Sequence, residues 1–100
     1  MNPARSSGPV LAVVGATGAV GSVLLQLLSV RADVWGAIRL IASPRSAGRL
    51  LAVRGEEAEV LALTEDAFDG MGRGDVVVFL TPADVSARWA PAATARGAAV

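Results

Sequence analysis

Continuous apolar runs mark the segments of this chain that are expected to be buried. Residues 10–14 and residues 76–80, the latter preceded by Asp75, are uninterrupted apolar stretches of strand length. Such runs are typical of parallel strands that are covered on both faces. Residues 38–42 form a third stretch, which is broken only by Arg39 and is followed by serine and proline. The pattern predicts three strands, at 10–14, 38–42 and 75–80, separated by loops.

Helical spacing of apolar residues predicts two helices. The first runs over 19–30, and the second follows residues 81–84, with Val85 and Trp89 facing inward together with Ala92 or Ala93. Because proline lacks an N–H and costs roughly 3 kcal/mol in a helix interior, we expect a kink at Pro91 or a helix that begins near it. The first helix carries one apolar stripe, formed by Val20, Val23, Leu24, Leu27 and Leu28.

A hairpin is expected between the second and third strands. Residues 50–54 and 59–63 alternate between apolar and polar positions, as half-buried strands do. Residues 55–57, Gly-Glu-Glu, separate them and predict the turn. The three glutamates at 56, 57 and 59 are then interpreted as part of a solvated turn.

The order of the predicted elements indicates an α/β fold. In the polar stretch 64–74, Phe68 and Met71 are expected to face inward. Residues 96–100 look like a helix stop followed by the first residues of another strand, so we expect that the chain once continued or is a truncated product. The predicted order is strand, helix, strand, hairpin, strand and helix. This order predicts an α/β fold with a Rossmann-like, doubly wound, mostly parallel sheet, which has a short hairpin insertion and is incomplete at its C-terminus.

Composition narrows the class of protein. One hundred residues, 53% of them apolar, predict one small domain, placed at 9–100 after a disordered tail at 1–8. No apolar run reaches the roughly 20 residues that span a bilayer, and no hydrophobic signal region opens the chain, so we expect a cytoplasmic protein without a membrane partner.

Nine arginines balance nine acidic residues, which argues against a nucleic-acid partner. Cysteine and histidine are absent, so we expect no Cys/His metal site and no catalytic residue in this chain.

The most informative motif is the glycine-rich segment 15–21, Gly-Ala-Thr-Gly-Ala-Val-Gly, between the first strand and the first helix. Gly15 would allow a sharp exit from the strand, Gly18 would let a pyrophosphate approach the backbone, and Gly21 would let the helix pack close to the sheet. The hydroxyl of Thr17 and the N–H groups of Gly18, Ala19 and Val20 are the expected phosphate donors. A tight turn without a ligand is the alternative interpretation.

Two further loops extend this candidate cofactor site. The second strand is followed by Ser43, Arg45 and Ser46 and by no carboxylate, which favours the 2′-phosphate of NADP over the free ribose of NAD. A solvated surface arginine is the alternative for Arg45. The third strand is followed by Thr81, whose loop would border the nicotinamide or pyrophosphate, although Asp84 or Ser86 in that loop would serve equally well as a helix cap.

The sequence resembles the N-terminal part of aspartate-semialdehyde dehydrogenases. The resemblance lies in residues 11–21, in the Ser-Pro-Arg-Ser loop within 41–48, in the strand 75–80 and in the helix segment 85–91. It covers nearly the whole chain from residue 10 onward, and about the first third of a typical family member. The chain departs from the family at residues 81–84, Thr-Pro-Ala-Asp, where small residues are usual: proline removes a donor and aspartate adds a charge near the cofactor path.

This resemblance implies an NADP-dependent enzyme of amino-acid biosynthesis, which interconverts L-aspartyl 4-phosphate and L-aspartate 4-semialdehyde. The family's catalytic Cys and His and its substrate-binding arginines would lie beyond residue 100, so the fragment alone is expected to be inactive. For the full-length protein, the resemblance implies a small-molecule substrate and assembly as a homodimer or homotetramer.

Two alternatives remain. N-acetyl-γ-glutamyl-phosphate reductase shares the fold and chemistry, and the sequence around the catalytic Cys would distinguish it. A non-catalytic NADP-binding sensor related to short-chain reductases is the other alternative, but residues 31–36 lengthen the path to the second strand beyond what such proteins usually have.

Overall fold

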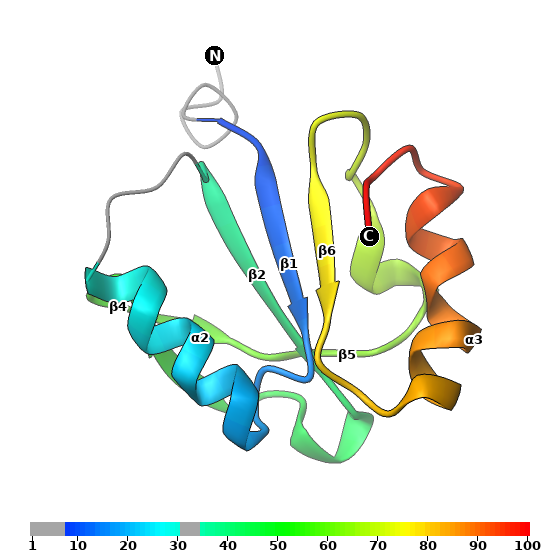
Figure 1. Cartoon of the computed structure of the whole chain (residues 1–100). Coiled ribbons are helices and arrows are strands. Elements are labelled where there is room, and N and C mark those ends of the chain that lie inside the picture. Colours follow the sequence, from blue (N-terminus) through cyan, green and yellow to red (C-terminus); the bar gives the residue numbers. More distant parts are fainter. Residues whose placement is uncertain (1–7, 31–34) are drawn as a thin grey trace.

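A four-stranded parallel sheet forms the centre of the computed structural model, which describes residues 8–30 and 35–100 (Figure 1). The expected tail at 1–8 and most of the loop at 31–36 therefore lie outside the described residues. The strand order is β5-β2-β1-β6. The strands span Val10–Val14 (β1), Ala37–Ala42 (β2), Leu61–Ala62 (β5) and Val76–Phe79 (β6).

Strand β1 lies in the middle of the sheet, and all five of its residues are buried. It pairs in parallel with β2, with Val14 opposite Ile41, and with β6, with Leu11 opposite Val76. Because this strand has a neighbour on each side and is covered on both faces, its side chains are buried away from water. This accounts for its uninterrupted apolar sequence. The predicted strand at 10–14 is confirmed, and the other two predicted strands differ from β2 and β6 only at their ends.

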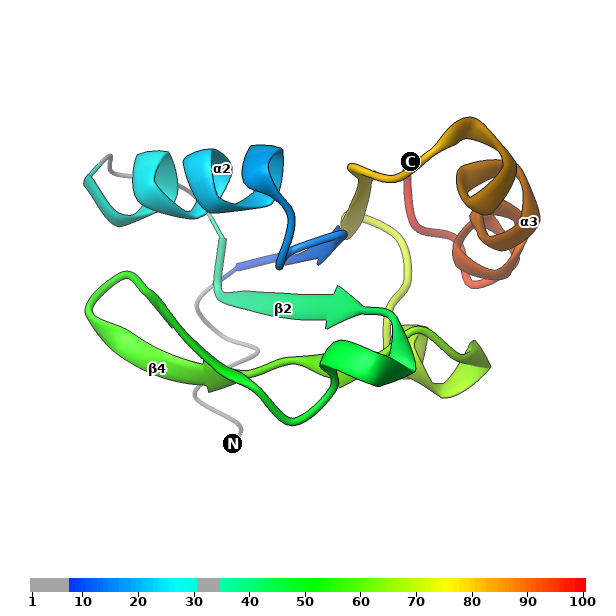
Figure 2. The ribbon, with the colours of Figure 1, turned by 90° about the horizontal axis from the view of Figure 1, so that it is seen from below.

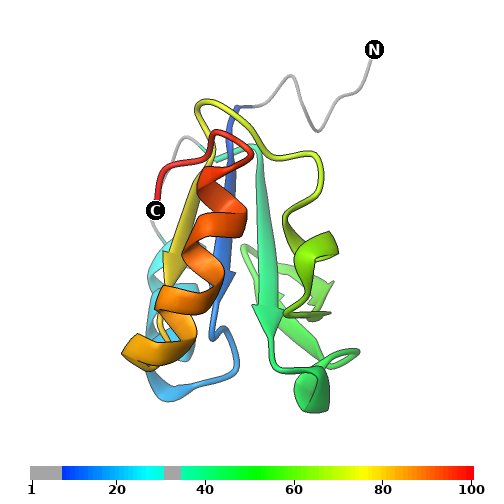
Figure 3. The ribbon, with the colours of Figure 1, turned by 90° about the vertical axis from the view of Figure 1, so that its right-hand side faces the viewer.

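The two long helices lie on opposite faces of the sheet (Figures 1 and 2). Helix α2 spans Ala19–Val30 and shares its face with the hairpin formed by β3 (Leu50–Val53) and β4 (Glu56–Glu59). Helix α3 (Ala83–Thr94) covers the other face together with the 3₁₀ turn η2 (Glu65–Phe68), and Figure 3 shows α3 in front of the sheet. This arrangement confirms the predicted doubly wound α/β fold with a hairpin insertion. Among the described residues, no helix is long and apolar enough to cross a membrane.

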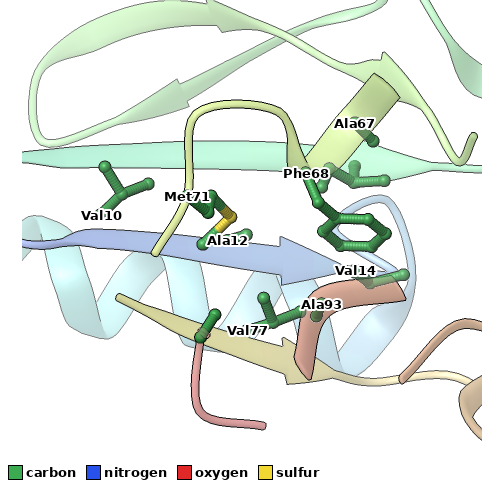
Figure 4. Packing of buried hydrophobic residues seen from close by; sticks show 10 residues of the cluster. Val10, Ala12, Val14, Ala67, Phe68, Met71, Val77 and Ala93 are labelled. Atoms are coloured by element: carbon green, nitrogen blue, oxygen red, sulfur yellow. The ribbon is translucent and has the colours of Figure 1, made fainter. Parts of the chain in front are cut away.

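The core beneath α3 and η2 is built around Phe68 (Figure 4). Its ring is fully buried and lies 6.3 Å, centroid to centroid, from the ring of Phe79 on β6. Met71 closes the same cluster, so the predicted inward positions of Phe68 and Met71 are confirmed. Helix α3 contributes Ala93, which is buried, and Trp89, which is partly buried.

The predicted hairpin turn is wrong. The turn is the pair Arg54-Gly55, both with positive φ (53° and 82°), which is the geometry of a tight two-residue hairpin loop. Glu56 and Glu57, expected in the turn, are instead exposed residues of β4, which pairs with β3. The expected second arm also ends early, because Leu61–Ala62 leaves the hairpin and joins the central sheet as β5.

Helix α3 runs continuously through Pro91, so a helix that begins near Pro91 is ruled out. Proline at this position removes the N–H that would bond the carbonyl of Ala87. Both residues are exposed, so water can hydrogen bond to that carbonyl. The solvent-facing position thus explains how the helix tolerates proline.

Asp75 is the only charged or polar residue that is buried among the described residues, at 2% exposure. Its carboxylate accepts hydrogen bonds from the N–H of Val10, at 2.8 Å, and from the N–H of Gly72, at 2.9 Å. These bonds fasten the first residue of β1 to the turn that precedes β6. Asp75 therefore holds together the amino ends of two neighbouring strands.

Candidate nucleotide-binding site

A cavity of about 310 Å³ opens where the carboxyl ends of β1, β2 and β6 meet. It is lined by the loop after β1 (Gly15, Thr17 and Gly18), by Ser43 after β2 and by Thr81 after β6. From β1 the chain crosses over α2 to β2, whereas β6 lies on the other side of β1 and leads into α3 on the opposite face. The strand order thus reverses direction between β1 and β6. Doubly wound sheets bind their ligands at the carboxyl ends of the two strands where this reversal occurs.

Gly15 makes the sharp exit from β1 that the sequence predicts. Its φ is +93°, and a Cβ at this position would lie 2.5 Å from the carbonyl oxygen of Leu80. Its N–H donates to the carbonyl of Ile41 at 2.8 Å. Only glycine combines this backbone conformation with such close contact, so Gly15 brings the loops after β1 and β6 together.

Gly18 differs from its expected role in one respect. Its N–H donates to the carbonyl of Gly15 at 3.1 Å, so this N–H is already engaged within the turn. A Cβ at Gly18 would meet only the Gly15 oxygen, at 3.5 Å, which is an ordinary contact. The fold does not require glycine here. The missing side chain leaves the cavity open beside the backbone, as the close approach of a phosphate needs.

The first turn of α2 has free donors and begins directly after Gly18, although Ala19 and Val20 themselves are not among the described residues that line the cavity. In the described part of the chain, the N–H groups of Ala19 and Val20 have no hydrogen-bond acceptor. Helix N-termini carry partial positive charge, and α2 has no acidic residue in its first turn that would compete for these donors. The side chain of Val20, in contrast, lines a different groove.

Gly21 packs against the turn itself. A Cβ there would lie 2.5 Å from the carbonyl oxygen of Gly15 and 2.7 Å from that of Ala16. The expectation that Gly21 lets the helix pack close to the sheet is thus sharpened: the close contact is with the carbonyls that lead out of β1. All three glycines of the motif therefore meet at one carbonyl group, that of Gly15.

The loop after β2 presents an unengaged arginine. Residues Pro44–Ser46 form a short 3₁₀ turn, in which the N–H of Ser46 donates to the carbonyl of Ser43 at 2.9 Å. Arg45 is exposed and makes no hydrogen bond or ion pair with any residue that the structure describes. Ser43 lines the cavity, whereas Arg45 and Ser46 lie next to it in the chain, outside its lining. Among the residues that the structure describes, no acidic side chain lines the cavity.

Thr81 lines the cavity from the loop after β6. Its hydroxyl lies 2.8 Å from the hydroxyl of Ser86, which also contacts the carbonyl of Pro82 at 3.2 Å. The cap position of α3 is Pro82, and no side chain caps the helix. The alternative role of Asp84 or Ser86 as a helix cap is therefore wrong.

An apolar wall of the cavity was not anticipated from the sequence. Leu63, Pro82 and Val85 contribute to it. Leu63 follows β5, and its N–H donates to the carbonyl of Ala42 at 2.8 Å, which fixes it beside the end of β2. A two-residue strand carries too weak a pattern to reveal this position. The available signal was that Pro82 and Val85 follow a predicted strand end.

The sequence matches the family described as semialdehyde dehydrogenase, NAD binding domain, over residues 10–100. It is 42% identical over 88 residues to the aspartate-semialdehyde dehydrogenase of Synechocystis sp., covering 88% of this chain and 25% of that protein. It is also 42% identical to the enzyme of Corynebacterium glutamicum, covering 90% of this chain and 26% of the relative. The chain thus spans about a quarter of the length of these relatives.

Solved structures agree with the sequence comparison. Aspartate-semialdehyde dehydrogenase II from Vibrio cholerae, complexed with ASA, superimposes with a TM-score of 0.81 at 31% identity, covering 91% of this chain and 29% of that one. A probable aspartate-semialdehyde dehydrogenase from Pseudomonas aeruginosa gives a TM-score of 0.79 at 34% identity, covering 91% and 26%. The chain therefore belongs to the semialdehyde dehydrogenase NAD-binding domain family and corresponds to the N-terminal part of aspartate-semialdehyde dehydrogenases.

Proposed function

We propose that this chain is the NADP-binding portion of an aspartate-semialdehyde dehydrogenase. The observation that carries the proposal is the cavity at the carboxyl ends of β1, β2 and β6. Free N–H donors of α2 come directly after its lining residue Gly18 in the chain, and the unengaged Arg45 comes two residues after its lining residue Ser43. In this proposal Thr17 and the N–H groups of Ala19 and Val20 hold the pyrophosphate. The apolar wall suits the flat ring systems of a dinucleotide.

The preference for NADP over NAD depends on the loop after β2. NAD-binding folds place a carboxylate near this position to bind the ribose 2′-hydroxyl, and that charge would repel a 2′-phosphate. Here Ser43, Arg45 and Ser46 offer two hydroxyls and a guanidinium, and Arg45 has no acidic partner among the described residues. A free guanidinium in the loop that contributes Ser43 to the cavity can form paired, charge-assisted hydrogen bonds with phosphate oxygens.

Replacing Arg45 with alanine is expected to weaken NADP binding by about 5- to 150-fold, which corresponds to the loss of about 1–3 kcal/mol from charged hydrogen bonds. NAD binding should not change, because NAD lacks the 2′-phosphate. Isothermal titration of the full chain with each nucleotide measures both effects.

The matched control for this measurement is Arg73→Ala. Arg73 is also exposed, but it precedes β6 and so lies at the opposite end of the sheet. Equal NADP affinity in the wild type and in Arg45→Ala would remove Arg45 from the site. An unaltered chain that binds NAD as tightly as NADP would contradict the coenzyme preference itself.

The whole protein, in this proposal, interconverts L-aspartyl 4-phosphate and L-aspartate 4-semialdehyde. The bound nicotinamide would supply or accept the hydride, and the residues of this chain would bind and orient the cofactor. The chain contains no cysteine and no histidine, so a thiol nucleophile and an imidazole base would have to come from another part of the enzyme. The names of the relatives described above favour this reaction over that of N-acetyl-γ-glutamyl-phosphate reductase.

The 100-residue chain alone is expected to show no dehydrogenase activity. Purified chain incubated with aspartate semialdehyde, NADP and phosphate should form no NADPH above the protein-free rate, as followed by NADPH absorbance. Thiol alkylation provides the control, because it would inactivate a contaminating cysteine-dependent enzyme but cannot modify a chain without cysteine. Turnover that survives alkylation and scales with the amount of chain would show that the chemistry is present in these residues.

A further inference from the structure

Two hydroxyl groups meet at the candidate nucleotide-binding cavity, those of Thr81 and Ser86. Thr81 lines the cavity from the loop after β6, and Ser86 belongs to the first turn of α3. Their oxygens lie 2.8 Å apart, and both residues are partly buried. Because no side chain caps α3, helix capping does not explain this pair. Polar groups placed singly in a ligand cavity are typically those that orient the ligand.

The side chain of Thr81 is held on both of its branches. Its methyl carbon Cγ2 lies 3.2 Å from the point that a Cβ of Gly15 would occupy, so the methyl group fills the space beside that glycine. The hydroxyl, on the other branch, contacts Ser86. A β-branched side chain has few favourable χ1 rotamers, and contacts on both branches select one of them. The Thr81 oxygen therefore has a defined position at the cavity.

The other contacts of Ser86 determine which hydroxyl of the pair is the donor. Ser86 Oγ lies 3.2 Å from the carbonyl oxygen of Pro82 and 3.4 Å from that of Thr81. Carbonyl oxygens only accept, so the single hydroxyl hydrogen of Ser86 is engaged with them. A bond to the carbonyl four residues earlier, here that of Pro82, is common for a serine in a helix. The bond between the two hydroxyls then takes its hydrogen from Thr81.

Thr81 is consequently left with lone pairs and without a hydrogen for a ligand. Among the described residues, no group other than Ser86 forms a hydrogen bond with the Thr81 hydroxyl. Such an oxygen accepts an N–H, whereas a phosphate oxygen has no hydrogen to offer it. The polarity of this hydroxyl thus excludes the phosphates of a nucleotide as its partners.

We propose that Thr81 is a specificity-determining residue, which accepts an N–H from the amino or amide group on one ring of NADP, and that Ser86 is the positioning residue that keeps Thr81 an acceptor. This inference rests on the proposed binding of NADP. Thr81 begins segment 81–84, where the sequence departs from the small residues that are usual in the family it resembles, so the contact would distinguish this chain.

The surroundings of Thr81 favour a ring of the cofactor as its partner. The residue that follows it, Pro82, belongs to the apolar wall of the cavity, and so does Val85, which precedes Ser86. A flat ring packed against this wall would bring the substituents at its edge toward the Thr81 hydroxyl. NADP carries two such N–H donors, the 6-amino group of adenine and the carboxamide of nicotinamide. Both offer the same chemistry, and analogues that lack one or the other can distinguish them.

Isothermal titration of the 100-residue chain with three nucleotides tests this role of Thr81. The nucleotides are NADP, its hypoxanthine analogue, in which an oxo group replaces the 6-amino group, and its 3-acetylpyridine analogue, in which a methyl group replaces the amide nitrogen. The unaltered chain should bind one analogue about 2- to 12-fold more weakly than NADP, the range expected for one net hydrogen bond. The analogue that binds more weakly identifies the ring. Thr81→Val, which keeps the shape of the side chain, should bind NADP and that analogue equally.

Ser86→Ala tests the positioning role. Without the Ser86 oxygen, the Thr81 hydrogen is free and the preference for NADP over the analogue should disappear, whereas Ser86→Thr keeps the hydroxyl and should keep the preference. In the Thr81→Val background, Ser86→Ala should have no further effect. The matched control is Thr94→Val, which removes an exposed hydroxyl of α3 that bonds only to the carbonyl of Pro91 and does not line the cavity. This control should bind all three nucleotides as the unaltered chain does.

The outcomes separate this inference from the proposed function. Binding of both analogues as tightly as NADP by the unaltered chain, or a preference for NADP that persists in Thr81→Val, would overturn the role of Thr81 and leave NADP binding intact. A loss in Ser86→Ala that is equal for NADP and both analogues would show a structural effect and overturn the positioning role. An unaltered chain that binds none of the three nucleotides would contradict the proposed function, and the role of Thr81 with it.

Discussion

Gly15→Ala is expected to lower the free energy of unfolding by about 2–6 kcal/mol, a large part of the roughly 5–15 kcal/mol that stabilises a small domain. Two costs add at this position. An alanine would have to adopt φ near +93°, which strains any residue with a Cβ by about 1–3 kcal/mol. The new methyl group would also lie 2.5 Å from the Leu80 carbonyl oxygen, and such overpacking costs about 1–3 kcal/mol.

Urea unfolding followed by circular dichroism measures this loss, and Gly18→Ala is the matched control. Gly18 belongs to the same turn, but its φ is not positive and a Cβ there would have only one ordinary contact, at 3.5 Å. We expect Gly18→Ala to keep the stability of the parent chain while it weakens NADP binding, because its methyl group would occupy the open side of the cavity. Equal loss of stability in both variants would contradict the distinct roles assigned to these glycines.

Asp75→Ala is expected to destabilise the chain by about 2–4 kcal/mol. The substitution removes the acceptor for two backbone N–H groups, those of Val10 and Gly72, in a place where the aspartate is only 2% exposed. A buried donor that loses its partner costs about 1–3 kcal/mol. The bond from Val10 is buried and the bond from Gly72 is partly buried, so the loss at Gly72 is the smaller of the two. Urea unfolding of the variant and of the parent chain provides the measurement.

Asp69→Ala is the appropriate comparison for Asp75→Ala. Asp69 forms an ion pair with Arg96 at 3.1 Å, but its side chain is 65% exposed. Exposed ion pairs contribute about 0–1 kcal/mol, so this variant should unfold at nearly the same urea concentration as the parent. A loss for Asp75→Ala as small as that for Asp69→Ala would show that water reaches the two N–H groups.

The glycine motif and the central strands could be predicted because local chemistry determines them. The run 10–14 has one stable environment, the middle of a parallel sheet, and a glycine is the residue that leaves such a strand with φ near +93°. The same locality explains the correct bounds of α2. It also explains why Gly15, Thr17, Gly18, Ser43 and Thr81, all placed after strands, line one cavity.

Other features depend on contacts that no local pattern contains. The tight turn at Arg54-Gly55 requires positive φ in an arginine, and three nearby glutamates suggested that the solvated turn lay further along. Helical spacing shows which residues share a side of α2, but not whether another layer covers that side. The engagement of the Gly18 N–H likewise follows from the folded turn, in which the Gly15 carbonyl turns back toward it.

The contacts of the Gly15 carbonyl restrict the number of residues in this turn as well as their identity. It accepts the N–H of Gly18 and lies against the position that a side chain of Gly21 would occupy. An insertion or deletion of one residue between them would rotate the helix by about 100° and bring a different residue against the oxygen. Over evolutionary time, segment 15–21 should therefore be inherited as an indivisible block that accepts substitutions at its exposed positions but no change in length.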